Sequence, residues 1–246
     1  MPSPPTPAEI DALVREAAAR AEPCARLLLA PRPGLRAPVA VLSGAFDPPT
    51  RAHAALARAA LRRGMATLLF AIAVQTVDKE RGTRAGVGLR LTLLCRYARR
   101  RPWLGVLVCN RGLYLEQAAA LAELGVDAPV FVIGFDKLSQ VFDPRYYADR
   151  DAALRRLFEA ARFLVAPRDA AGQAEIDAFM ARPEQRAYRA AVAPLPLSAA
   201  EARLTAGMAS TRVRELAARG DPWLELLPVE TRALAARSGV YGPAGA

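Results

Sequence analysis

Apolar residues in this chain gather in short continuous runs, separated by longer stretches in which they recur at every third or fourth position. A short continuous run is typical of a strand covered on both faces of a parallel sheet, and the longer spacing is that of an amphipathic helix. The expected strands are residues 39–42, 67–74, 104–109, 130–133 and 163–166, with a weaker one at 190–195, and the expected helices between them are residues 52–63, 89–100, 114–124 and 152–161.

The regular alternation of strand and helix predicts an α/β fold. Such a pattern favours a doubly wound, mostly parallel, Rossmann-like sheet with helices on both faces and right-handed crossovers. Ligands of these sheets bind at the carboxyl ends of the strands. We therefore expect the functional residues directly after strands.

The first residues carry the signals of a helix start. Thr6 can cap a helix with its hydroxyl, Pro7 suits the first helical position, and Glu9 lies three residues after the cap. These signals predict a helix over residues 7–22, after which two prolines and a glycine interrupt the chain. Residues 1–36 are therefore expected to form an N-terminal helical extension.

The C-terminal part is expected to be helical from about residue 198. One helix is predicted over residues 210–219 and another over residues 229–238, and each is followed by a glycine that can end it. The chain contains no internal repeat and no linker that would divide it. Residues 37–246 are therefore expected to form a single domain with a helical C-terminal portion.

The composition is typical of a globular protein. Of the 246 residues, 53% are hydrophobic and 24% are charged, which allows a large core. No apolar run approaches the roughly 20 residues of a membrane-crossing helix. The three cysteines fit neither a disulfide framework nor a zinc site, and the N-terminus lacks the pattern of a secretory signal. We expect a cytoplasmic protein without a membrane partner.

The formal net charge of +10 raises the question of nucleic-acid binding, because a basic surface attracts phosphates. Nearly all the basic residues are arginines, and the excess of Ala, Arg, Gly and Pro is typical of a GC-rich genome. The arginines are scattered along helices, without a basic tail and without interleaved aromatic residues for base stacking. Nucleic acid is therefore not an expected partner.

The loop after the first expected strand has the features of an anion site. Gly44 allows a ligand to approach the backbone closely, and Thr50 can cap a helix whose N-terminal amides favour an anion. His53, the only histidine of the chain, lies one turn into that helix and would face the same anion. The alternative is an ordinary core or surface histidine that falls at this point by chance.

Two segments resemble signatures of a known superfamily. Residues 44–53, GAFDPPTRAH, resemble the first signature of the nucleotidyltransferases that carry a His/Thr-x-Gly-His motif. Thr50 stands at the first motif position, and Ala52 replaces the usual Gly, a mild change in a helix. Residues 209–216, ASTRVREL, resemble the second signature, Ser-Ser/Thr-x-x-Arg at the start of a late helix. The resemblance implies transfer of a nucleoside monophosphate from a nucleoside triphosphate to a phosphorylated acceptor.

Segments between and after the signatures are similar to nicotinamide and nicotinate mononucleotide adenylyltransferases. These segments are residues 132–142, 162–168 and 227–241, so that the resemblance covers residues 39–241 and marks residues 37–246 as the nucleotidyltransferase domain. It implies transfer of AMP from ATP to nicotinate or nicotinamide mononucleotide, with release of pyrophosphate, as in NAD biosynthesis. A tryptophan of the bacterial members is absent, and residues 110–114 also depart from them, which indicates a divergent branch.

The resemblance also implies roles for individual residues. His53 and Thr50 would hold oxygens of the α- and β-phosphates, and Ser210, Thr211 and Arg214 would hold the leaving pyrophosphate. Mg²⁺ would arrive with ATP, and no metal-ligating residues are expected. Catalysis would then rest on alignment and charge stabilisation. Further nucleotide contacts are expected from Ser43, Gly44, Ala45, Phe46, Lys79, Gly134 and Asp136, and acceptor contacts from Phe142, Tyr146, with Tyr147 as its alternative, and Arg168.

Some alternatives stay open. Lys79 and Arg168 can be ordinary surface residues, and Asp136 can cap a turn. The same chemistry can act on another acceptor, as in a cytidylyltransferase for a sugar or alcohol phosphate or a pantetheine phosphate adenylyltransferase. A nucleotide-binding regulatory protein without turnover is a further reading, against which His53 and Arg214 argue. A Rossmann dehydrogenase is disfavoured because no Gly-x-Gly-x-x-Gly follows the first strand. The oligomeric state is open, a homo-oligomer included.

Overall fold

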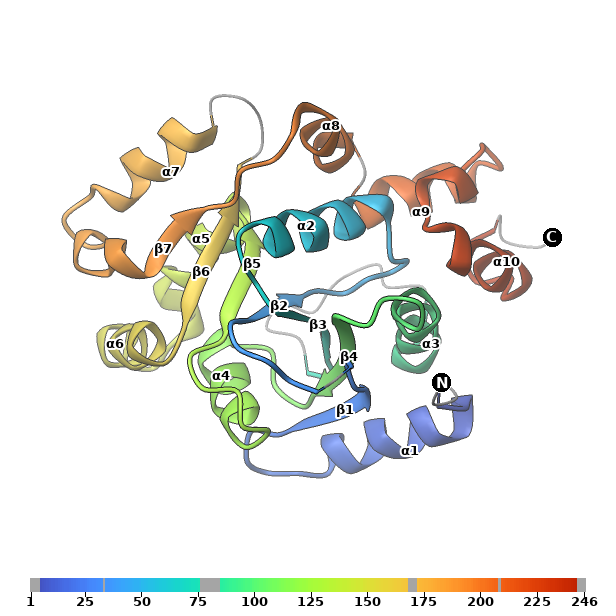
Figure 1. Ribbon diagram of the computed structural model, residues 1–246, viewed down its shortest axis with the longest axis horizontal. Helices are drawn as coiled ribbons and strands as arrows, with labels where there is room; N and C mark the ends of the chain where they lie inside the picture. The colour runs from blue at the N-terminus through green and yellow to red at the C-terminus, as the bar shows by residue number, and fades with distance from the viewer. Residues whose placement is uncertain (1–4, 33, 76–84, 168–171, 208, 243–246) are drawn as a thin grey trace.

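The computed structural model describes residues 5–32, 34–75, 85–167, 172–207 and 209–242, and its centre is one sheet (Figure 1). Within these residues the sheet has seven strands in the order β1-β4-β3-β2-β5-β6-β7. Strands β2 to β7 run parallel, and β1 is antiparallel to β4. This arrangement confirms the predicted α/β fold. The strands are β1 (Ala25–Leu29), β2 (Val39–Ser43), β3 (Thr67–Ala73), β4 (Leu104–Cys109), β5 (Val130–Gly134), β6 (Arg162–Ala166) and β7 (Val192–Pro194).

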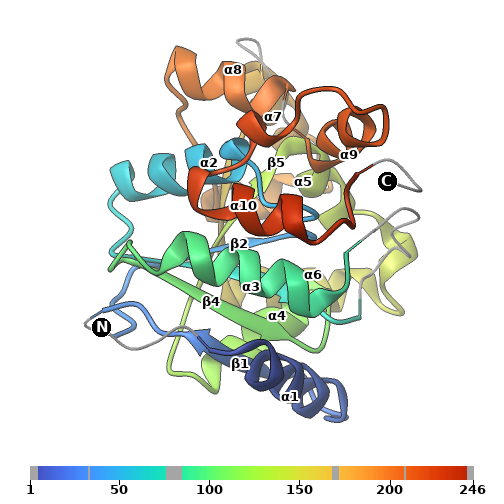
Figure 2. The ribbon, with the colours of Figure 1, turned by 90° about the vertical axis from the view of Figure 1, so that its right-hand side faces the viewer.

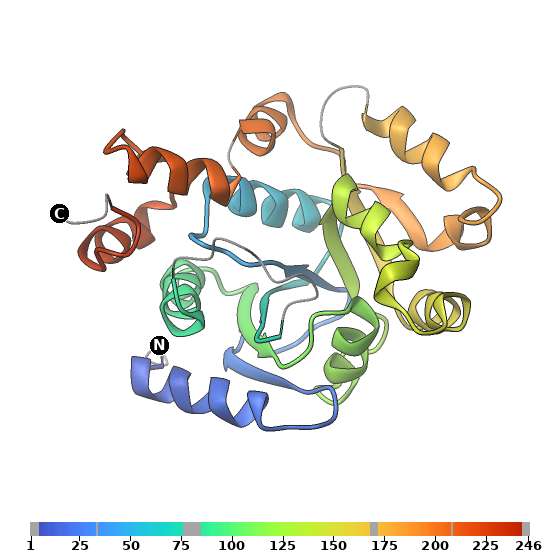
Figure 3. The same cartoon turned by 180° about the vertical axis from the view of Figure 1, so that it is seen from behind.

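Helices cover both faces of the sheet. Because successive side chains of a strand point to opposite faces, β4 contributes Val106 and Val108 to one core and Leu107 to the other. The first core includes side chains of α1, α2 and α3, and the second includes side chains of α4 to α7, which Figure 3 shows from behind. These helices are α1 (Pro7–Ala18), α2 (Arg51–Arg62), α3 (Val87–Ala98), α4 (Tyr114–Ala122), α5 (Phe135–Val141), α6 (Arg150–Ala160) and α7 (Gly172–Met180).

Three helices follow the last strand, α8 (Ala199–Gly207), α9 (Ser210–Ala218) and α10 (Val229–Arg237). Helix α8 packs against α2, and α10 packs along α3, as Figure 2 shows. A third core joins side chains of α9 and α10 to Leu93 of α3. The C-terminal portion therefore returns to the face that α2 and α3 cover.

The N-terminal segment contributes a strand as well as a helix. The expected capping box is present, since the Thr6 backbone N–H donates to Glu9 Oε2 at 2.6 Å and the Glu9 N–H donates to Thr6 Oγ1 at 3.3 Å. Helix α1 ends at Ala18 rather than at residue 22, and the edge strand β1 was not predicted. The domain boundary at residue 36 stays a prediction.

The other expected strands and helices end within two residues of the predicted positions. Helices α5 and α7 lie outside the predicted set. With seven residues, α5 is too short to show a helical period clearly. No helix among the described residues has the length and apolar character needed to cross a membrane.

Candidate active site

The loop between β2 and α2 has a tightly held backbone. Phe46 has a φ of +49°, a left-handed conformation that is unusual for an aromatic residue. Its buried ring lies 5.1 Å from the Phe70 ring and 4.7 Å from the His53 ring, measured between centroids. Arg90 of α3 donates from Nη1 to the carbonyl of Ala45 at 2.7 Å. The loop is therefore held from both sides at the carboxyl end of β2.

His53 is fixed in the first turn of α2 by its Nδ1 atom. The backbone N–H of Thr50 donates to Nδ1 at 2.9 Å, so Nδ1 carries the lone pair and the ring proton lies on Nε2. Burial lowers the pKa of His53 from 6.5 to about 4. At neutral pH the side chain is therefore an uncharged imidazole whose remaining polar group is an N–H donor.

The start of α9 docks on the same loop. Ser210 Oγ donates to the carbonyl of Pro48 at 2.9 Å. Arg214 Nη1 donates to the carbonyl of Asp47 at 2.7 Å, and Nη2 donates to Thr211 Oγ1 at 3.1 Å. The structure thus brings the two signature segments into direct contact.

Asp47 is a fully buried carboxylate at this junction, and no role was predicted for it. Its Oδ1 accepts a hydrogen bond from the Ala85 N–H at 3.3 Å, and its Oδ2 lies 3.8 Å from Arg214 Nη1. Burial and the neighbouring Asp47 carboxylate raise the pKa of Tyr241. Asp47 therefore links the first signature segment to Ala85, two residues before α3, and to the C-terminal portion.

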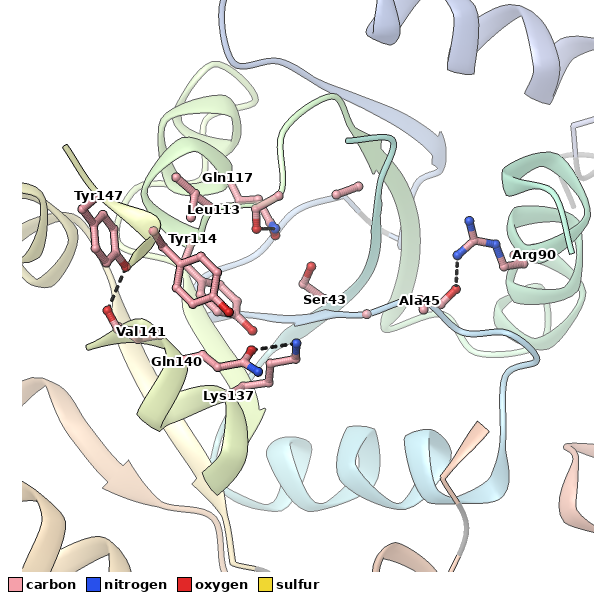
Figure 4. A pocket seen from close by; sticks show the side chains of 14 residues that line it. Ser43, Ala45, Arg90, Leu113, Tyr114, Gln117, Lys137, Gln140, Val141 and Tyr147 are labelled. Carbon is pink, nitrogen blue, oxygen red and sulfur yellow. Dashed lines mark hydrogen bonds between the residues drawn. The ribbon is translucent and has the colours of Figure 1, made fainter. Parts of the chain in front are cut away.

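A pocket of about 200 Å³ lies beside this loop, at the carboxyl ends of β2 and β3 and next to the segments that follow β4 and β5 (Figure 4). Small residues at the end of β2 form one side. Residues of α3, α4 and α5, and residues just before α4 and just after α5, complete the lining. The aromatic and polar side chains among them are Ser43, Arg90, Tyr114, Gln117, Lys137, Gln140, Tyr146 and Tyr147.

Some polar side chains of the pocket already form hydrogen bonds with other residues of its lining. Gln117 is 2% exposed, its Nε2 donates to the Gly112 carbonyl at 2.9 Å, and its Oε1 has no hydrogen-bond partner among the described residues. Tyr147 donates from its hydroxyl to the Val141 carbonyl at 2.8 Å, and burial raises its pKa to about 12. Burial also raises the pKa of Tyr114. Both phenols are therefore uncharged at neutral pH.

The expected site residues other than Phe46, Phe142 and those at the contact between the two signature segments fall into three groups. Ser43, Gly44, Ala45 and Tyr146 line the pocket. Gly134, the last residue of β5, and Asp136, exposed in the first turn of α5, are not among the pocket residues. Lys79 and Arg168 lie outside the described residues.

Phe142 does not line the pocket. It is 4% exposed, and its ring lies 5.4 Å from Phe158 and 5.6 Å from Phe179 in the second core. It offers little surface to an acceptor, because the aromatic cluster covers it. Phe46 is also buried, so only its backbone is available to a nucleotide.

The sequence did not predict a role for five polar pocket residues, Arg90, Tyr114, Gln117, Lys137 and Gln140. All of them except Gln140 lie within the first four residues of the helix that follows β3, β4 or β5. This position is where a doubly wound sheet places its ligand site, so the topology carried a usable signal. In so arginine-rich a chain, residue type alone gave no such signal for Arg90.

Residues 41–216 match the cytidylyltransferase-like family, a range that includes both signature segments. The chain belongs to this family. It is therefore a nucleotidyltransferase, and the recognition from the two signatures is confirmed. No curated protein matches the chain.

Among solved structures, the chain is similar to a Vibrio parahaemolyticus protein described as a putative nicotinate-nucleotide adenylyltransferase. That protein is 15% identical, the comparison covers 82% of this nucleotidyltransferase and 94% of the other chain, and the TM-score is 0.45. A likeness of this degree carries no argument about substrates.

Proposed function

We propose that this nucleotidyltransferase transfers AMP from ATP to nicotinate or nicotinamide mononucleotide and releases pyrophosphate. The proposal rests on the adjacency of two features, the docked signature segments and the pocket that begins at Ser43. With the triphosphate at the signature segments and the acceptor in the pocket, the acceptor phosphate would lie beside the α-phosphorus. Such alignment supplies much of the rate enhancement in this kind of reaction.

The transfer needs no protein nucleophile. An oxygen of the acceptor phosphate, already ionised, attacks the α-phosphorus of ATP, and the bond to the bridging oxygen of the β-phosphate breaks. Negative charge grows on the pyrophosphate as it leaves. His53 would stabilise this charge through its Nε2–H, the α2 and α9 N-termini through backbone amides, and Arg214 through its cation.

We propose that Mg²⁺ enters with ATP and reduces the charge on the phosphates. The residues that the structure describes contain no group of three or more His, Cys, Asp or Glu side chains able to hold a metal ion. Phosphate oxygens and water are the ligands that Mg²⁺ ordinarily keeps when protein carboxylates are few.

The lining of the pocket supports an aromatic acceptor base. Tyr114, Tyr146 and Tyr147 offer ring faces, and the small side chains of Ser43 and Ala45 leave room beside them. Aromatic rings pack favourably in offset or edge-to-face arrangements. A pyridine ring is therefore the acceptor base that we propose, with Tyr146 or Tyr147 in the place of the absent tryptophan.

A second candidate is cytidylyl transfer from CTP to a sugar or alcohol phosphate. The family description favours this reading, since the matching family is named for cytidylyl transfer. A third candidate is a nucleotide-binding protein without turnover.

Pyrophosphate release separates the candidates when ATP and CTP are each combined with a panel of acceptors. The panel contains the two pyridine mononucleotides, pantetheine phosphate and phosphorylated sugars and alcohols. We expect turnover with ATP and a pyridine mononucleotide. Turnover with CTP alone, or with ATP and only non-pyridine acceptors, contradicts the proposal, and binding without turnover favours the regulatory protein.

Removal of His53 or Arg214 tests the catalytic site. We expect His53→Ala and Arg214→Ala each to lower kcat by about a hundred- to a thousandfold, because loss of one such donor costs about 2.7 to 4 kcal/mol in the transition state. The exposed Arg63 at the end of α2 provides the control, and Arg63→Ala should retain the wild-type rate. Near-normal turnover of His53→Ala would show that this histidine is not catalytic.

A further inference from the structure

The pocket beside the first signature segment carries two cations and no acid among the residues that the structure describes. Of the described lining residues, Arg90 and Lys137 are the charged ones. Arg90 is 6% exposed and donates to the Ala45 carbonyl, so its charge lies next to the loop where transfer would occur. Lys137 reaches the pocket from α5, in a different part of the lining (Figure 4). A pocket of this charge favours an occupant with negative charge in two places.

Among the described residues, no carboxylate pairs with the positive charge of Lys137. Its Nζ donates to Gln140 Oε1 at 2.9 Å, and no Asp or Glu among the described residues forms an ion pair with it. An ammonium group has three N–H donors, and a neutral amide accepts only one of them. Lys137 therefore keeps donors and a net charge for a ligand.

Gln140 adds a further donor to the same place. Because an ammonium can only donate, the contact with Lys137 fixes the Gln140 amide with Oε1 toward Nζ and leaves its NH₂ group on the other side. Both residues line the pocket. Together they present N–H groups alone, which suits a group that only accepts hydrogen bonds.

We propose that Lys137, supported by Gln140, selects an acceptor that carries a carboxylate in addition to its reacting phosphate. The inference rests on the proposed function and sharpens it, because nicotinate mononucleotide has a carboxylate where nicotinamide mononucleotide has a neutral amide. A charge-assisted hydrogen bond to an ammonium is about twice as strong as a neutral one. The pocket should therefore prefer the acid over the amide.

A different role for Lys137 would be contact with the reacting phosphate. Arg90 is better placed for that role, because it donates a hydrogen bond to the Ala45 carbonyl in the loop of the first signature segment. Lys137 instead lies in α5, the helix that follows β5. The two roles give different results with a matched pair of acceptors, because both mononucleotides carry the same phosphate and differ only at the carboxylate or amide.

The test compares kcat/KM for the two mononucleotides at saturating ATP in the wild-type enzyme, Lys137→Gln and Lys137→Arg. The wild type should favour the acid at least about tenfold, and Lys137→Gln should lose about ten- to a hundredfold on the acid, mainly through KM, with little change for the amide. Lys137→Arg should keep most of the preference, and the KM for ATP should stay constant. Arg155→Gln, the same charge change at an exposed position of α6 outside the pocket, should behave as wild type.

Equal losses on both acceptors, or none on either, would overturn the proposal for Lys137. Calorimetric binding of each mononucleotide with a non-hydrolysable ATP analogue separates this result from failure of the proposed function. Binding that prefers the acid and depends on Lys137, without pyrophosphate release, would contradict only the proposed activity. Binding of neither mononucleotide would contradict both.

Discussion

His53 illustrates how a position in a helix can set the protonation state of a side chain. The Thr50 N–H occupies Nδ1 and assigns the proton to Nε2, while burial disfavours the cation. A cationic histidine would attract phosphate more strongly but would lose its charge near pH 6.5. The neutral ring instead keeps the same donor across the neutral range of pH.

The chain has one histidine, so its titration can be followed directly by NMR. We expect the ring resonance of His53 to titrate near pH 4 in the folded protein and near 6.5 in the urea-unfolded chain. Because the unfolded state takes up the proton first, the free energy of unfolding should fall as the pH drops from 6.5 toward 4. A midpoint near 6.5 in the folded protein would show that burial does not control this ring.

At the residue scale, the sequence identifies the site best where a residue is rare or stands in a motif. His53 and Arg214 were found through the two signatures, and they lie on segments that touch. Lys137 and Gln117 carry no motif, and their importance follows from the pocket that the fold assembles around them. Asp47 was overlooked although it stands inside the first signature, because its burial depends on α3 and α9.

At the element scale, buried strands were predicted more reliably than edge elements. Strands β3 and β4 are covered on both faces and therefore have continuous apolar runs. Strand β1 pairs on one side only, includes the half-buried Arg26 and is followed closely by Pro31. Its short pattern cannot be distinguished from that of a loop, and its place in the sheet comes from long-range pairing with β4.

Asn110 connects the N-terminal segment to the loop after β4. It is fully buried, its Oδ1 accepts from the Cys24 N–H at 2.8 Å, and its Nδ2 donates to the carbonyls of Arg20 and Glu22 at 3.1 and 2.8 Å. The pocket residue Tyr114 lies four positions further along the chain. One side chain therefore ties the segment between α1 and β1 to the pocket wall.

Replacement of Asn110 by Leu should affect both stability and the pocket. Buried backbone groups left without partners cost about 1 to 3 kcal/mol each, so urea unfolding should show a loss of at least about 1 kcal/mol. The KM for the acceptor should rise while the KM for ATP stays constant. Glu16→Ala, which removes the partly exposed Arg26–Glu16 ion pair in the same segment, serves as the control and should cost less than about 1 kcal/mol. Equal losses in the two variants would contradict this role of Asn110.

At the scale of the whole molecule, the C-terminal portion is tied back to the first half of the sheet at two points. Arg214 holds α9 on the loop after β2, and Arg62 of α2 pairs with Glu201 of α8, with Nη1 to Oε1 at 2.8 Å. The order of elements along the chain predicts the sheet, but each of these two contacts joins residues more than a hundred positions apart. Closure of the site is therefore a property of the complete fold.

The Arg62–Glu201 pair makes a prediction for stability in acid. The hydrogen bond from Arg62 first, and those from Ser198, hold the pKa of Glu201 at about 2 against a usual value of 4.5. Since the folded pKa is the lower one, the pair stabilises the fold above pH 4.5, and this contribution should disappear as the pH falls from 4.5 toward 2.

Glu201→Gln should therefore lower the free energy of unfolding by about 1 to 3 kcal/mol at pH 7. This range allows for solvent screening, because Arg62 is half exposed. At pH 3 the same substitution should lower the free energy of unfolding much less. Urea unfolding at a series of pH values between 7 and 3 measures both quantities. Glu159→Gln, at an exposed position of α6, should run parallel to the wild type throughout. If the wild-type and Glu201→Gln curves also ran parallel below pH 4.5, the ion pair would not hold α8 to α2, and hydrophobic packing would have to account for that contact.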